Sequence, residues 1–339
     1  MELHQINTKL PFVCFGESRV GGRPENQDTF GYDDTPFGLL VTVCDGMGGG
    51  PGGKTASSIA VKEIVEGVSK ASSDETPANA LLKAIHKANL AILEAVEENP
   101  KLMGMGTTCT ALLINKESAI IAHVGDSRVY QLRCHRKVFR TFDHSMVFGL
   151  VKEKVITEEQ ARLSEQSNII TRALGLKPEL EIDIIERPYE KGDRFMLCTD
   201  GIHGTMPEPE LIKRATEDAN LGQVVDDLAT FVDGEGRKNG GGHDNLTLVI
   251  VETENNSIQK EKMSKLNKII LIGVSALLVA SAILNITQCS RNKNKKQETK
   301  NTVVMDSIQV GTYGDTVFWY NGKQYRQVIN RETIKSYMP

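Results

Sequence analysis

The pair Asp45-Gly46, which ends an apolar run, is the feature that most constrains how this chain can fold. The run itself, residues 39–44, reads Leu-Leu-Val-Thr-Val-Cys and predicts a buried strand. Carboxylates beside candidate strands recur at three more positions: Asp28, Asp200 (followed by Gly201) and Asp244. Mg²⁺ and Mn²⁺ prefer oxygen ligands, and glycine lets a backbone carbonyl come close enough to join them. The pattern therefore predicts a divalent-cation site where strands end.

Size, charge and cysteines narrow the class of protein. At 339 residues the chain can form one large or two ordinary domains with a substantial core. The net charge of −4, with acids and bases mixed, excludes the basic face that nucleic-acid binding requires. The six cysteines are scattered without a CxxC pair, so we expect a reducing compartment and neither a disulfide nor a zinc framework. Residues 1–10 are polar and lack the apolar core of a signal peptide, so we expect the first domain in the cytoplasm.

Residues 1–255 predict one globular domain of the α+β class. Helices are predicted where apolar residues recur at helical spacing or near it: 55–70, 77–98, 209–219 and 221–232. Apolar runs predict strands at 12–15, 39–44, 108–114, 119–124, 129–132, 195–198 and 246–251. The runs 119–124 and 129–132 form the clearest predicted hairpin. Because strands outnumber helices and several look paired, we expect antiparallel sheets covered by helices.

A C-terminal apolar stretch, residues 269–286, predicts one transmembrane helix, since 269–284 carries no charge. A bilayer crossing usually takes about 20 residues, so the stretch is short for a span, and a buried core helix is the alternative. Lysines crowd the predicted linker 256–268, and basic residues follow at 291–296, which a core helix would not need. Because both flanks are basic, orientation rests on the absent signal peptide and the free cysteines. They place the first domain on the cytoplasmic side of the plasma (inner) membrane.

The remaining segment, 287–339, is predicted to be an extracytoplasmic tail with a β-hairpin. Asn321-Gly322 is a typical hairpin turn, and it stands between the strand-like runs 316–320 and 323–329. An isolated hairpin is marginally stable in water. It must therefore pack either on its own neighbours or on an extracytoplasmic partner, and the sequence leaves both open.

Between Gly16 and Glu252 the chain resembles the metal-dependent protein phosphatases of type 2C, and within them the bacterial branch. Eight motifs in order carry the resemblance: Arg23-x-x-Asn26-Gln27-Asp28, Asp45-Gly46-Met47-Gly48-Gly49, Gly106-Thr107-Thr108, residues 124–130, Asp143-His144-Ser145, residues 168–175, Thr199-Asp200-Gly201 and Asp244-Asn245-Leu246-Thr247. Any one of them is weak, because Asp-Gly pairs are common in turns. The whole set, in order, is specific.

The resemblance implies a four-layer αββα sandwich of two antiparallel sheets flanked by helices. It also implies hydrolysis of phosphoserine and phosphothreonine in proteins by a metal-activated water. In the family pattern Asp45 bridges two Mn²⁺ or Mg²⁺ ions. The Gly46 carbonyl, Asp200 and Asp244 complete the shell, and Asp28 acts close by, partly through water. Phosphorylated proteins are the implied substrates, and a membrane-bound serine/threonine kinase is the opposing partner.

Two further roles follow from the same resemblance. Arg23 resembles the arginine that grips the substrate phosphate, since a guanidinium fork donates two charge-assisted bonds. Asp126 resembles the ligand that, with Asp200, holds a third and weaker metal. A plainer interpretation stays open for each position: the aspartates could cap turns, and Arg23 could be a surface charge. His144 is expected to order a loop near the metals, with proton transfer as the alternative.

Some positions depart from the family pattern. Met47 stands where some relatives carry a histidine that could protonate the leaving oxygen, so the general acid stays open between a metal-bound water and His144. Gln27, Gly50 and Lys54 also differ, and we expect altered metal affinity with activity retained. The segment 141–175 matches the family's flap, and Thr157 and Gln160 predict a capping box at the start of a short helix.

Two functions of other classes compete with catalysis. One is an inactive relative that binds phosphoproteins or scaffolds a complex. The other is a sensor whose tail carries the main role. The intact set of Arg23, Asp28, Asp45, Asp200 and Asp244 counts against the first, because inactive relatives usually lose some of these residues.

Overall fold

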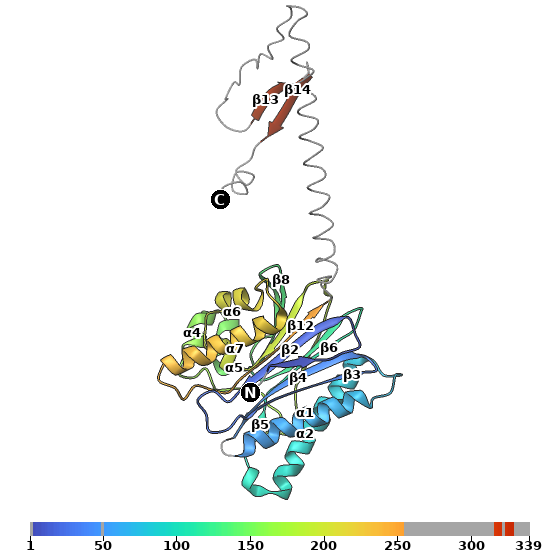
Figure 1. Ribbon diagram of the computed structural model, residues 1–339, viewed down its shortest axis with the longest axis vertical. Helices are drawn as coiled ribbons and strands as arrows, with labels where there is room; N and C mark the ends of the chain where they lie inside the picture. The colour runs from blue at the N-terminus through green and yellow to red at the C-terminus, as the bar shows by residue number, and fades with distance from the viewer. Residues whose placement is uncertain (1–2, 49–50, 254–314, 321–322, 329–339) are drawn as a thin grey trace, which may run out of the picture. The chain divides into compact units, whose positions relative to one another are not determined.

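The computed structural model describes residues 3–48, 51–253, 315–320 and 323–328 (Figure 1). Contacts divide the chain into two units, Met1–Ser257 and Ile258–Pro339. The predicted linker 256–268 and span 269–286 lie outside the described residues. None of the helices within those residues combines the length and the apolar character that a bilayer crossing requires.

Two antiparallel sheets form the centre of the first unit, which confirms the predicted α+β class. One sheet has six strands, and its middle strands are apolar and buried. In spatial order they are β1 (His4–Ile6), β2 (Phe12–Arg19), β12 (Leu246–Thr253), β11 (Arg194–Cys198), β8 (Arg128–Arg133) and β9 (Arg136–Arg140). The second sheet runs β10 (Asp183–Arg187), β7 (Ala119–Val124), β6 (Cys109–Ile114), β4 (Gly38–Met47) and β3 (Asp28–Thr35), with β5 (Gly106–Thr107) paired to β4.

Helices cover the outer faces of both sheets (Figure 1). The long helices are α1 (Pro51–Ser69), α2 (Pro77–Glu98) and α7 (Leu221–Lys238). The short ones are α3 (Met146–Lys152), α4 (Glu158–Arg162), α5 (Asp200–His203), α6 (Glu208–Ala215) and the 3₁₀ turn η1 (Pro100–Leu102). Helix α2 has the predicted bounds, with Thr76 as its N-cap and Pro77 in its first turn. Helix α4 begins with the predicted capping box of Thr157 and Gln160.

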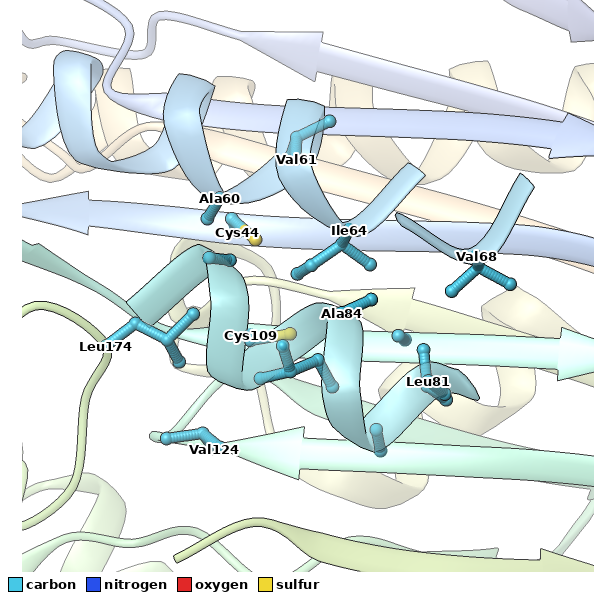
Figure 2. Packing of buried hydrophobic residues seen from close by; sticks show 14 of the residues in the cluster. Cys44, Ala60, Val61, Ile64, Val68, Leu81, Ala84, Cys109, Val124 and Leu174 are labelled. Atoms are coloured by element: carbon cyan, nitrogen blue, oxygen red, sulfur yellow. The ribbon is translucent and has the colours of Figure 1, made fainter. Parts of the chain in front are cut away.

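Alternation along the central strands explains the layers. In β4, Leu40 and Cys44 pack toward α1 and α2, whereas Leu39, Val41 and Val43 pack between the two sheets. Strand β11 alternates in the same way between the opposite sheet and helices α5 to α7. Figure 2 shows how tightly the outer layer is filled by small and branched side chains of α1, α2 and β4. Strands buried on both faces place β4 and β11 at the centre of the domain, and their ends carry Asp45 and Asp200.

The predicted hairpin over 119–132 is wrong, because β7 and β8 belong to different sheets. Strand β7 pairs with β6 and β10, whereas β8 pairs with β11 and β9. Both strands are buried along almost their whole length, so no alternation of buried and exposed positions indicates which neighbour each one takes. The turn at Gly125 to Ser127 crosses from one sheet to the other and carries Asp126 with it.

In the second unit, β13 (Asp315–Tyr320) and β14 (Lys323–Val328) pair antiparallel, with Tyr320 opposite Lys323. This pairing is the one that the predicted tail hairpin requires.

Candidate active site

A cleft of about 430 Å³ opens where β4, β11 and β12 meet the β7–β8 turn. Six of the predicted site residues line it: Arg23, Asp45, Gly46, Asp126, Asp200 and Asp244. Asp28 does not line the cleft but is buried behind it, opposite Asp45 in the β3–β4 pair. His144 is not among the lining residues either. The structure therefore brings together side chains that are up to 221 positions apart in the sequence, such as Arg23 and Asp244.

The backbone of Asp45 is fixed from both sides. Its amide donates to Thr108 Oγ1 at 2.9 Å, and its carbonyl accepts from the Thr108 amide at 2.9 Å and from Thr107 Oγ1 at 2.8 Å. Residues 106–108 therefore support the site from a neighbouring segment. A carboxylate on a backbone held in this way is pre-positioned for a ligand.

Asp45 and Asp200 are each followed by a glycine, because another backbone segment passes close to the next residue. A Cβ added at Gly46 would lie 2.0 Å from the Gly53 carbonyl oxygen. One added at Gly201 would lie 1.9 Å from the Asn245 carbonyl oxygen. Any side chain at either position would push apart segments that together form the cleft, so the Asp-Gly pairs are a packing requirement as well as a turn signal.

Burial and mutual repulsion raise the pKa values of Asp28, Asp45 and Asp200. Burial is the largest cause for Asp28, whose pKa rises to about 7 although Thr247 and Thr199 hydrogen-bond to its carboxylate. Burial, followed by the charge of Asp244, raises the pKa of Asp200 to about 6. The pKa of Asp45 also lies well above its usual range, first through burial and then through the neighbouring carboxylates. Burial and repulsion thus disfavour the charged form of each of these carboxylates, and a bound cation would remove that penalty.

The donor set fits divalent cations. In the part of the chain that the structure describes, Oδ1 of Asp28 and Oδ1 of Asp200 are buried without a hydrogen-bond partner. Buried carboxylate oxygens normally have hydrogen-bond partners. Two without a partner in one cluster therefore point to a ligand that is not part of the polypeptide. Oxygen atoms alone, from carboxylates and the Gly46 carbonyl, are the ligands that Mg²⁺ and Mn²⁺ prefer.

Arg23 stands at the mouth of the cleft, where its guanidinium donates to Asp244 Oδ2 at 2.9 Å. The loop that carries Arg23 is held by the side chain of Asn245. The Asn245 amide donates to the carbonyls of Val20 (2.7 Å) and Glu25 (2.9 Å), and its oxygen accepts from the Gln27 amide (2.8 Å). Sequence reasoning placed Asn245 in a motif but gave it no role, because its three partners lie more than 200 residues away.

Sequence reasoning also missed the residues that support Asp126. The buried His203 ring bonds through Nε2 to the Asp126 carbonyl oxygen at 3.0 Å. Two residues after Asp126, the Arg128 guanidinium donates two bonds of 2.7 Å to the Asp143 carboxylate, and both side chains are buried. Burial raises the pKa of Asp126, with the charges of Asp200 and Asp143 adding to it. No local pattern signals these contacts, because His203 is 77 residues from Asp126 and β9, which brings Asp143 to Arg128, is not among the predicted strands.

Comparison with known proteins agrees with this geometry. The family model for protein phosphatase 2C matches residues 15–239. The chain belongs to the protein phosphatase 2C family of serine/threonine phosphatases. The family resemblance predicted from the motifs is thereby confirmed, and the family's dependence on metals agrees with the donor set.

Two solved structures and one sequence illustrate the similarity to this phosphatase family. The serine/threonine phosphatase stp of Listeria monocytogenes is 32% identical over 236 residues, which cover 68% of this chain and 92% of that protein. The structure of the S. agalactiae serine/threonine phosphatase is 30% identical with a TM-score of 0.65, covering 72% of this chain and 100% of that one. The catalytic domain of the phosphatase PstP, solved with two manganese ions, is 28% identical with a TM-score of 0.62, covering 72% and 99%.

Proposed function

We propose that this phosphatase hydrolyses phosphoserine and phosphothreonine in proteins by direct attack of water at a centre of two Mn²⁺ or Mg²⁺ ions. The convergence of four aspartates on one cleft, with two orphan carboxylate oxygens, carries the proposal. Burying like charges together is unfavourable unless cations neutralise them. The two manganese ions in the PstP catalytic domain support the same count.

Asp45, the Gly46 carbonyl, Asp200 and Asp244 would hold the two ions, with Asp28 close behind Asp45. Asp126, together with Asp200, would hold a third and weaker one. Bound there, divalent cations supply an activated water near neutral pH and neutralise charge on the phosphoryl oxygens. Within the described residues, the cleft lining contains no cysteine, serine or histidine, and the hydroxyl of Thr108 accepts a bond from the Asp45 amide. With the aspartates assigned to the ions, water would be the nucleophile, and no covalent enzyme intermediate would form.

Arg23 would bind the phosphate group of the substrate. Its side chain is 49% exposed at the cleft mouth, and its fork can donate two parallel bonds to phosphate oxygens. The present pair with Asp244 is solvent-exposed and stabilises the protein by only about 0–1 kcal/mol. Exchange of that carboxylate for a phosphate is therefore inexpensive.

The decisive test uses the purified chain, Mn²⁺ and a phosphothreonine peptide. We expect phosphate release that stops when EDTA is added and returns when Mn²⁺ is restored. Release that is absent, or that ignores the chelator, would favour the competing function of an inactive phosphoprotein-binding scaffold.

We also propose that residues 269–286 anchor the chain in the plasma membrane, with the phosphatase domain in the cytoplasm opposing a serine/threonine kinase. The uncharged stretch 269–284 and its basic flanks support the anchor. The free cysteines of the described residues, four of them buried, support a reducing compartment. Protease added to intact cells should cut the tail, and a protected tail would contradict this orientation. Deleting residues 301–339 tests the competing function of a sensor whose tail carries the main role. Unchanged activity and an unchanged phenotype in cells would exclude that function.

A further inference from the structure

His144 holds Gly125, the residue directly before Asp126, from two sides. The His144 amide donates to the Gly125 carbonyl at 2.7 Å, and the Gly125 amide donates to His144 Nδ1 at 3.1 Å. His144 thus satisfies both backbone polar groups of Gly125, the donor and the acceptor, directly before Asp126. Few other arrangements would fix the direction of that turn as closely.

The ring of His144 also reaches in the opposite direction. Burial lowers its pKa, so the ring is neutral at neutral pH and carries one proton. Because Nδ1 accepts from Gly125, that proton is on Nε2, which donates to Asp183 Oδ2 at 3.2 Å. The other oxygen of Asp183 accepts from Arg172 at 3.2 Å. Asp183 therefore fixes the tautomer that the bond from Gly125 requires.

His144 and the residues that follow it also join the two ends of the flap, residues 141–175. The His144 carbonyl accepts from the Thr171 amide at 2.7 Å, and the Met146 amide donates to the Ile169 carbonyl at 2.9 Å. An isolated bridge between Ser145 and Ile170 lies between these bonds. The turn that bears Asp126, the base of the flap and the edge strand β10 all meet at His144.

A metal ion is the other candidate occupant of this cluster. Ligand atoms of His123, His144 and Asp183 lie within 4.8 Å of one another, and His123 Nδ1 is buried without a partner in the described residues. Two observations oppose a cation. The Arg172 guanidinium lies 3.3 Å from His144 Nε2 and already supplies the positive charge. The lone pair that a metal would need on Nε2 is occupied by the proton donated to Asp183.

We propose that His144, Asp183 and Arg172 are positioning residues that hold the Asp126 turn against the flap base and thereby set the affinity of the third, weaker cation site. The proposal rests on the proposed role of Asp126. None of the three side chains lines the cleft, so they act through Gly125 and not on the substrate.

Three variants of the full-length purified protein test the two ring bonds of His144 separately, the one to Gly125 and the one to Asp183. His144→Ala removes both ring bonds, while the bond from its own amide remains. His144→Asn keeps an acceptor near the place of Nδ1 but cannot reach Asp183. Asp183→Asn keeps an acceptor oxygen for Nε2 and removes the charge that holds Arg172, so it is the mildest change if His144→Ala folds poorly. Glu181→Gln is the matched control, because Glu181 pairs with Arg172 but is 77% exposed and takes no part in the bonds to His144 described above.

Calorimetric titration with Mn²⁺ measures the weaker site directly. We expect its Kd to rise roughly five- to thirtyfold in His144→Ala, the loss of one or two hydrogen bonds. The rise should be smaller in His144→Asn and Asp183→Asn and absent in Glu181→Gln. The Mn²⁺ concentration for half-maximal turnover of a phosphopeptide should rise by the same factor, with the rate restored at saturating Mn²⁺ and KM for the peptide unchanged.

Two results would overturn the proposal. One is a lower Tm in the three variants with an unchanged Kd of the weaker site, which shows a structural role alone. The other is a wild-type protein that binds only two Mn²⁺ ions. Failure of the proposed function is distinguishable, because a wild type that releases no phosphate still gives the binding titration.

Discussion

Two groups of acids surround the Asp126 turn, and they differ in their counter-charges. At the flap base, Asp143 receives two bonds from Arg128, and Asp183 receives bonds from Arg172 and His144. In and behind the cleft, Asp28, Asp45 and Asp200 have mainly one another as neighbours, and their pKa values are raised. The paired acids hold the scaffold together. The unpaired acids lower the stability of the protein, which agrees with the proposal that cations bind there.

Removing the charge of Asp45 has the largest expected effect, and it tests whether the unpaired acids serve catalysis and not stability. We expect Asp45→Asn to lower turnover of a phosphopeptide at least about 10³-fold, because cation stabilisation of the transition state contributes several kcal/mol. Without metal, the variant should be as stable as the wild type or more stable, since one repelling charge is gone. Phosphate release across an Mn²⁺ titration and Tm in EDTA check both. A residual rate within tenfold of wild type would contradict the bridging role.

The second prediction concerns a paired acid, Asp143, and removes its cationic partner. Arg128→Ala leaves Asp143 buried without its partner, so we expect the free energy of unfolding to fall by about 3–5 kcal/mol. Urea unfolding of the two proteins measures the difference. Arg237→Ala is the matched control, because Arg237 pairs with Asp233 while 73% exposed, and its removal should cost under about 0.5 kcal/mol. Equal losses in the two variants would remove the distinction between buried and exposed pairs.

The pH dependence of the metal-free protein sharpens the same contrast. The pKa of Asp28 is raised to about 7 in the folded state, so the folded protein binds more protons than the unfolded chain between the two pKa values. Stability from this group is therefore present at low pH and lost as pH rises through about 7. In EDTA, the wild type should lose about 3 kcal/mol between about pH 5 and pH 8 relative to Asp28→Asn. Parallel stability curves for the two proteins would contradict the raised pKa, and saturating Mn²⁺ should abolish the difference.

Much of the cleft could be predicted because local patterns encode it. Periodic apolar residues predicted α2 with its observed bounds, and the ordered Asp-Gly motifs predicted that Asp45 and Asp200 share one site. The paired acids could not be predicted in the same way. Arg128 and Asp143 meet because β8 pairs with β9, whereas the sequence favours a hairpin between residues 119–124 and 129–132. Strands that are buried on both faces do not encode their neighbours.

Asp244 differs from the other acids of the cleft, because it has a cationic partner, the Arg23 guanidinium. Arg23→Lys keeps the charge and loses the fork, so we expect kcat/KM for a phosphopeptide to fall roughly 10- to 30-fold. Mn²⁺ affinity should stay within about twofold, because the exposed pair with Asp244 contributes little to holding that carboxylate. Steady-state kinetics at saturating Mn²⁺ give the first quantity and calorimetry the second, with Arg237→Lys as the exposed control. If Mn²⁺ affinity falls together with kcat/KM, Arg23 acts by positioning Asp244, and the guanidinium belongs with the paired scaffold instead of the substrate site.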